Sequence, residues 1–367
     1  MVEEGMNMNR NIKRSMAGAV VLASALGVAQ VDNIKYKTGM MLKSKRYVVY
    51  NPKDMKKLLV VKDKPVLIQD DSMRVVEDRV YSLDFACAPD LDPPVIDPTP
   101  TDAVVPWGIN KVQAIEAQVL NNGKDIIVCV ADTGVDVDHP DIKDMIIGGE
   151  SYVAGEGSYD DDEGHGTHVA GIIAAQANDR DVIGVAQSRI LVSKVLDSWG
   201  SGYGSWIAAG IVGCVNKGAR IINMSLGSGA EYGPDPLIRD AVNYAISKNV
   251  IVVAAAGNDS GDPVGYPAAL PGVIGVASSD RNDRLSSFSN VGPEIDYIAP
   301  GSDILSLKNG GGVVSYSGTS MATPHVAGVI ALSLATGNPV GVDNIGLAPE
   351  QQGAGRVNAL KTVKGER

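Results

Sequence analysis

Between residues 125 and 277 the chain repeats one pattern, in which short apolar runs alternate with segments of helical length. The apolar runs show little polar–apolar alternation, so we expect strands that are buried on both faces. Such strands, separated by helices, predict an α/β fold with a mostly parallel sheet covered by helices. The expected strands are Asp125–Ala131, Arg189–Val195, Ala219–Met224, Val250–Ala255 and Gly272–Ala277, and the expected helices are Gly166–Ala177, Ser205–Lys217 and Pro236–Lys248.

Conspicuous polar residues lie where these elements begin or end. Asp132 directly follows the first strand, and Asn258 follows the strand Val250–Ala255. His165 precedes the first helix, and Ser320 precedes a helix that we expect to hold Pro324 in its first turn. Each residue has an ordinary explanation as a turn, a satisfied side chain or a helix cap. Together they supply an acid, an amide, a base and a nucleophile at the edge where parallel sheets gather functional groups.

The order Asp, His, Ser along the chain is that of subtilisin. The surrounding residues also resemble the subtilisin-like serine proteases, or subtilases, over roughly residues 105–361. The matching segments are Val105-Pro106-Trp107-Gly108, Asp132-Thr133-Gly134, His165–Gly171, Asn223–Gly227, Ala299-Pro300-Gly301 and Gly318–His325.

The resemblance implies a three-layer fold, with a mostly parallel central sheet between helices and a small α+β prodomain in front. It also implies a serine endopeptidase that hydrolyses peptide bonds through an acyl-enzyme on Ser320. His165 would be the general base, and Asp132 would orient its imidazole. The side chain of Asn258 and the backbone N–H of Ser320 would stabilise the oxyanion.

Further residues are assigned only by this resemblance. Two backbone edges would bind an extended protein or peptide substrate, and two residues would hold a structural calcium ion. The substrate edges are Gly200-Ser201-Gly202 and Ser225-Leu226-Gly227, and the calcium residues are Asp141 and Asn178.

The front of the chain has its own organisation. Residues 1–29 combine a basic flank, a short apolar run and small residues, which predicts a secretory signal peptide. Residues 30–87 contain two strand-like segments, Arg46–Tyr50 and Arg74–Tyr81, and resemble the family's inhibitory prosegment. The Pro-rich residues 88–104 predict an exposed linker that contains the processing site. Residues 105–367 would form the catalytic domain.

Charge separates the same parts of the chain. Of 32 basic and 43 acidic side chains, residues 1–104 contain 15 and 14, which leaves 17 and 29 in the rest. An acidic body argues against a nucleic-acid partner, and the apolar run near the N-terminus is too short for a stable membrane anchor. We expect a secreted monomer that is inhibited by its own prosegment. A cytoplasmic protease for intracellular processing and a non-catalytic peptide-binding member of the fold are the alternatives.

Three cysteines cannot all pair within one chain. Cys129 and Cys214 fall in an expected strand and an expected helix, and we interpret both as buried, small apolar residues. A cysteine hydrolase is disfavoured because no known motif surrounds Cys214.

Overall fold

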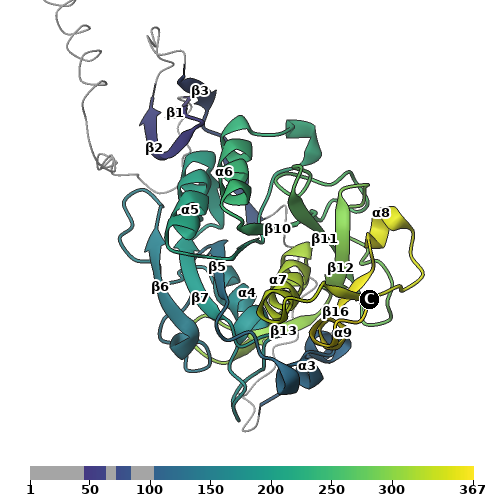
Figure 1. The fold of residues 1–367 in the computed structure, drawn as a ribbon. Helices are drawn as coiled ribbons and strands as arrows, with labels where there is room; N and C mark the ends of the chain where they lie inside the picture. The colour runs from purple at the N-terminus through teal and green to yellow at the C-terminus, as the bar shows by residue number, and fades with distance from the viewer. Residues whose placement is uncertain (1–44, 63–71, 84–102) are drawn as a thin grey trace, which may run out of the picture.

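The computed structural model describes residues 45–62, 72–83 and 103–367 (Figure 1). A nine-stranded sheet has the order β15-β16-β12-β11-β10-β9-β5-β7-β6 and is parallel except for the β15–β16 pair. The expected mostly parallel α/β sheet is therefore confirmed. Its strands are β5 (Ile127–Asp132), β6 (Ile146–Ser151), β7 (Arg189–Lys194), β9 (Ile221–Met224), β10 (Ile251–Ala255), β11 (Val273–Ser279), β12 (Ile295–Pro300), β15 (Gly341–Asp343) and β16 (Arg356–Asn358).

The sheet divides the apolar core into two layers, as alternation along a strand requires. In β5, Val128 and Val130 belong to the core cluster that contains residues of α4 and α7. Cys129 and Ala131 belong to the cluster that contains residues of α5 and α6, on the opposite face. The major helices are α4 (His165–Ala174), α5 (Gly204–Asn216), α6 (Pro236–Ser247) and α7 (Thr319–Thr336). Shorter elements are α2 (Trp107–Lys111), α3 (Ala114–Leu120), α8 (Pro349–Gln352), α9 (Ala359–Lys364) and the hairpin β13 (Ile304–Leu307) with β14 (Val313–Tyr316).

A disulfide joins Cys129 of β5 to Cys214 of α5, across 85 residues of sequence. Both residues are buried, as expected, but they are paired and not separate apolar residues. The sequence offers no signal for this pairing, because only the crossover between the strand and the helix brings the two positions together.

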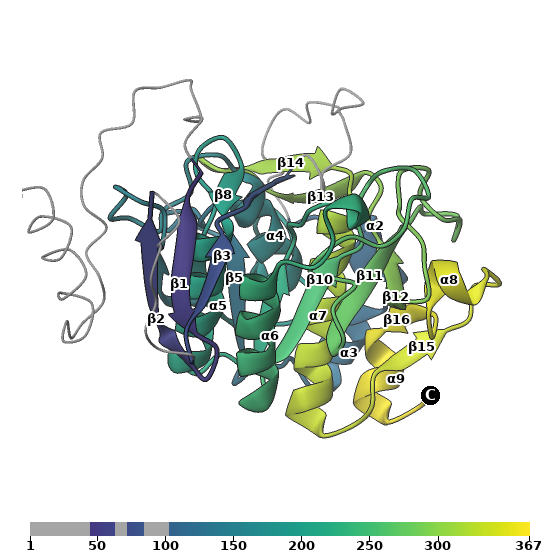
Figure 2. The same cartoon turned by 90° about the horizontal axis from the view of Figure 1, so that it is seen from above.

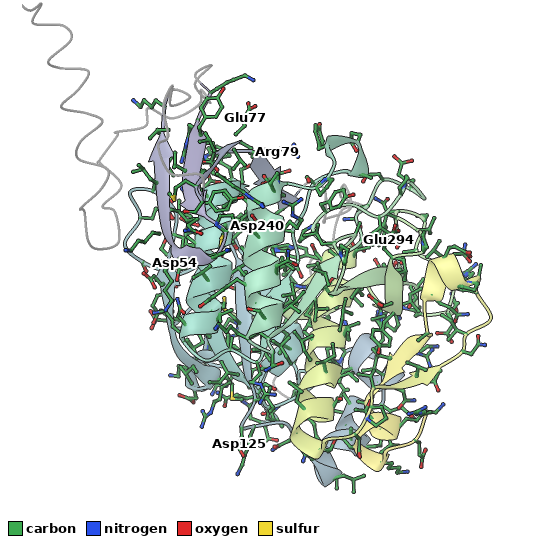
Figure 3. All side chains as sticks on the ribbon, turned by 45° about the horizontal axis from the view of Figure 1, so that its top comes forward. Asp54, Glu77, Arg79, Asp125, Asp240 and Glu294 are labelled. Atoms are coloured by element: carbon green, nitrogen blue, oxygen red, sulfur yellow. A yellow bond between two sulfur atoms is a disulfide. The ribbon has the colours of Figure 1, made fainter. Side chains whose placement is uncertain are left out.

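The front of the chain forms a separate antiparallel sheet with the order β2-β1-β3. Its strands are β1 (Tyr47–Asn51), β2 (Asp54–Val61) and β3 (Arg74–Glu77), and both views place them beside α5 and α6 (Figures 1 and 2). Asp240 of α6, labelled in Figure 3, accepts hydrogen bonds from the Tyr50 hydroxyl at 2.9 Å and from Arg74 Nη1 at 2.6 Å. This ion pair and hydrogen bond attach the front sheet to the body.

The expected strand Arg74–Tyr81 is wrong in one respect, because the structure divides it at Asp78. β3 stays in the front sheet, whereas β4 (Val80–Ser82) leaves it and pairs antiparallel with β8 (Ser201–Tyr203). Asp78 is held at the division by Arg46 Nη2 at 3.0 Å and by the backbone N–H and hydroxyl of Ser205, both at 2.8 Å. Within residues 45–62 and 72–83 the structure shows no α-helix, and the expected signal peptide lies outside the described residues.

Candidate active site

Asp132 and His165 meet at the carboxyl edge of the sheet. Asp132 is the last residue of β5, which ends one residue later than expected, and His165 is the first residue of α4. Asp132 Oδ1 lies 2.7 Å from His165 Nδ1, and both side chains are buried. A carboxylate that accepts the Nδ1 proton fixes the orientation of the ring and leaves Nε2 with its lone pair. The pair is therefore suited to accept a proton at Nε2.

The turn after Asp132 is locked against the start of α4. The backbone N–H of Thr133 donates to Asp132 Oδ1 at 2.8 Å, and the hydroxyl of Thr133 accepts from the backbone N–H of Gly166 at 3.0 Å. A side chain at residue 166 would collide with the backbone oxygen of Gly134. Glycine at this position lets the turn after Asp132 approach α4 closely.

Ser320 lies in the first turn of α7, where backbone N–H groups have no partner inside the helix. Its Oγ donates to the backbone oxygen of Ser225 at 3.0 Å. Pro324 stands in the second turn, not in the first as expected, and so it cannot donate a helical bond to the Ser320 oxygen. The hydroxyl of Ser225 donates to that oxygen instead, at 2.8 Å. The proline therefore leaves the Ser320 oxygen available to Ser225, and this hydrogen bond holds the turn that carries Ser320.

Asn258 follows β10 and is oriented by Thr319. Its Oδ1 accepts from the backbone N–H of Thr319 at 2.9 Å and from the Thr319 hydroxyl at 3.1 Å. Its Nδ2 is buried and has no hydrogen-bond partner among the described residues. A buried amide donor without a partner costs free energy unless a ligand or a reacting group accepts from it. The side chain is thus an available donor that is held by Thr319, the residue before Ser320.

The two predicted substrate edges enclose a segment of the chain itself. In the β4–β8 pairing, Tyr81 is opposite Gly202 and Ser82 is opposite Ser201. The backbone N–H of Leu83 donates to the Gly200 oxygen at 2.9 Å. On the other side, Ser82 forms an antiparallel bridge with Gly227. An extended backbone therefore lies between the edges Gly200–Gly202 and Ser225–Gly227.

The Subtilase family model matches residues 123–359, which is more than half of the chain. The chain belongs to the subtilase family. This places it among serine endopeptidases and agrees with the resemblance seen in its motifs.

Individual subtilases are similar over the same region. An "Intracellular serine protease" of Paenibacillus polymyxa is 43% identical over 62% of this chain and 72% of its own length. A "Thermostable alkaline protease" of Halalkalibacterium halodurans is 48% identical over 62% of each protein, and so this match spans less than two thirds of that relative. "Subtilisin Savinase" of Lederbergia lenta is 46% identical over 62% of this chain and 83% of its own length.

The two expected calcium residues are neighbours in this subtilase. Asn178 Nδ2 donates to Asp141 Oδ1 at 2.7 Å, and the backbone N–H of Val182 reaches Asp141 Oδ2 at 3.3 Å. Burial raises the pKa of the Asp141 carboxyl to about 7, because few groups compensate its charge. The oxygen donors fit a hard cation, and rotation of the Asn178 amide would present its oxygen. At this pair, as in the rest of the described residues, no cluster of three or more His, Cys, Asp or Glu side chains has the geometry of a metal site.

Several residues that shape the site do not stand out in the sequence. Asp161 accepts hydrogen bonds from the Thr133 hydroxyl and from the backbone and hydroxyl of Thr167, and Glu163 accepts from the backbone N–H of His165. Buried Lys194 contacts the same region. The only sequence signal for Lys194 is a charge within an apolar strand.

Within the described residues, no helix is both long and apolar enough to cross a membrane.

Proposed function

We propose that this subtilase is synthesised as a precursor and hydrolyses peptide bonds through an acyl-enzyme on Ser320. The observation that carries the proposal is the orientation of Asn258, whose amide donor is buried and unpartnered beside the serine turn. The Asp132–His165 pair supports the same chemistry, because a serine hydroxyl needs an oriented base.

In the proposed first step, Ser320 Oγ attacks the substrate carbonyl and passes its proton to His165 Nε2. Asp132 stabilises the resulting imidazolium and remains ionised. The negative charge on the former carbonyl oxygen is stabilised by Asn258 Nδ2 and by the backbone N–H of Ser320. The C–N bond then breaks, and the imidazolium gives its proton to the leaving amine. Water repeats the sequence on the acyl-enzyme and restores the serine.

We also propose that residues 30–87 act as an inhibitory prosegment and residues 105–367 as the catalytic domain. The support is β4, which occupies the space between the two substrate edges and therefore competes with substrate. The proposed linker, residues 88–104, lies almost entirely outside the described residues. We propose that this linker contains the processing site.

Export is proposed for this chain on two grounds. Residues 1–29 have the pattern of a signal peptide, and the Cys129–Cys214 bond suits an oxidising compartment. The similarity to the "Intracellular serine protease" favours the alternative, a protease that stays in the cell. We further propose a structural calcium ion at Asp141 and Asn178.

The function is tested by expressing the wild-type chain and Ser320→Ala in parallel. We expect the wild type to shorten itself and to cleave unfolded casein, and Ser320→Ala to do neither. His165→Ala should lose most of its activity as well. N-terminal sequencing of the shortened wild type then locates the cut. Full casein cleavage by purified Ser320→Ala would overturn the proposal.

A further inference from the structure

Lys194 is a buried charge that the proposed catalytic steps do not use. It is the last residue of β7, and only 1% of its surface is exposed. It lies opposite Asp132 in the β5–β7 pairing and opposite Ser151 in the β6–β7 pairing. An ammonium group this deeply buried is costly unless its three protons are all bound.

The contacts of Lys194 Nζ meet that requirement. It donates to the backbone oxygen of Thr133 at 2.7 Å, to Asp162 Oδ1 at 2.6 Å and to the backbone oxygen of Leu196 at 3.0 Å. Glu156 Oε2 lies further away, at 3.5 Å. Thr133 follows Asp132, and Asp162 belongs to the loop that leads into α4. One ammonium group therefore ties the segment that carries Asp132 to the segment that carries His165.

We propose that Lys194 is a positioning residue that holds the Asp132 turn and the His165 loop in the geometry that the reaction needs, and that its charge tunes the basicity of His165. The inference rests on the proposed serine-protease function. Lys194 joins three groups close to the proposed reaction: the Thr133 backbone oxygen, the Asp162 carboxylate and the Leu196 backbone oxygen.

The electrostatic part of the proposal depends on the groups that face His165. Asp132 approaches from β5, Glu163 from the preceding loop and His168 from the same helix. The acidic members favour a protonated imidazole. Lys194 opposes them and also neutralises Asp162 and Glu156, which otherwise add to the negative potential.

Because Lys194 and Asp162 carry opposite charges, removing one or the other should shift the pH profile of kcat/KM in opposite directions. Lys194→Met leaves the carboxylates unopposed, and so the acid limb of the kcat/KM profile should move to higher pH. Asp162→Asn leaves the ammonium unopposed, and the limb should move to lower pH. In Lys194→Met with Asp162→Asn both charges are absent, and we expect the limb to return toward its wild-type position.

Positioning is tested separately by kcat. We expect kcat on a chromogenic peptide to fall about a hundredfold in Lys194→Met, with a much smaller change in KM, because misplacement of catalytic groups by about 1 Å has effects of this size. The double variant should regain the pH profile without regaining kcat. Lys194→Arg keeps the charge and should keep the acid limb. Lys217→Met is the matched control, because Lys217 pairs with Glu150 at 3.2 Å with 41% of its side chain exposed.

The outcomes separate this inference from the proposed function. Casein cleavage by wild type that is lost in Ser320→Ala establishes the protease, whatever the lysine variants do. If folded Lys194→Met then has wild-type kcat and an unmoved acid limb, the positioning role is wrong. If Lys194→Met does not fold, the test is made with Asp162→Asn. An acid limb of the kcat/KM profile that stays at its wild-type pH in that variant also overturns the inference.

Discussion

In the proposed mechanism, Asn258 is oriented for a charge that exists only during the reaction. Both hydrogen bonds to its Oδ1 come from Thr319, and they hold the amide so that Nδ2 remains buried and unpaired. This arrangement costs stability in the resting protein. When an oxyanion forms, the donor stabilises it without any reorganisation of the site.

Replacement of Asn258 by Ala should therefore lower kcat and leave KM nearly unchanged. Loss of the corresponding donor in subtilisin costs about 10²–10³ in kcat, and we expect a loss of that order here by analogy. Steady-state kinetics on a peptide substrate measure both constants. A matched rise in KM at constant kcat would show that Asn258 binds the substrate and not the transition state.

The residues that we propose react are easier to predict from sequence than the residue that we propose positions them. Asp132, His165 and Ser320 stand in short motifs whose order is itself informative. The part played by Lys194 depends on the register between β5 and β7, which places it opposite Asp132. No local pattern encodes a register between strands that are 57 or more residues apart.

At the scale of elements, the helices and most strands follow from apolar periodicity, but their pairing does not. The expected helix Pro236–Lys248 is observed as Pro236–Ser247, with Asp235 accepting from the backbone N–H of Leu237 as its cap. The segment Arg74–Tyr81 reads as one strand, because both halves favour extended backbone. The structure separates them through Asp78, whose partner Ser205 is 127 residues away.

The loop around Asp141 gives a prediction for metal removal. If calcium binds there, it should raise the melting temperature of the wild type, and chelator should lower it. Calcium at 100 times its Kd contributes about 2.7 kcal/mol. Asp141→Asn should abolish the difference between calcium and chelator, whereas the exposed Asp138→Asn should keep it. Identical melting of the wild type in calcium and in chelator would count against the site.

At the scale of the whole molecule, the front sheet leads through β4 to the two edges that we propose bind substrate. The sheet is attached to α6 through Asp240 and reaches α5 through Asp78, and β4 continues from there between the substrate edges. The Arg46 guanidinium lies 3.6 Å from the centre of the Tyr203 ring and also pairs with Asp78. The attachment therefore includes Tyr203 of β8, the strand that we propose binds substrate.

Asp78→Ala should weaken the proposed inhibition by residues 30–87. The change leaves Arg46 and the start of α5 without their partner, and breaking a buried pair costs about 3 kcal/mol or more, which corresponds to a roughly hundredfold weaker association. The lag before casein cleavage in the processed enzyme should shorten. Glu77→Gln is the control, because the Lys45–Glu77 pair is exposed and surface pairs contribute little. An unchanged lag in Asp78→Ala would show that β4 alone holds the prosegment.

The same residue predicts the direction of the pH effect on release. Burial raises the pKa of Asp78 in the closed molecule, where desolvation outweighs the attraction of Arg46. The closed form therefore binds a proton more readily than the released prosegment does. By linkage, this carboxyl favours closure as the pH falls through its raised pKa and opposes closure above it. We expect the wild-type lag to shorten as the pH rises from the acidic range, and Asp78→Asn, which cannot ionise, to lose that part of the pH dependence.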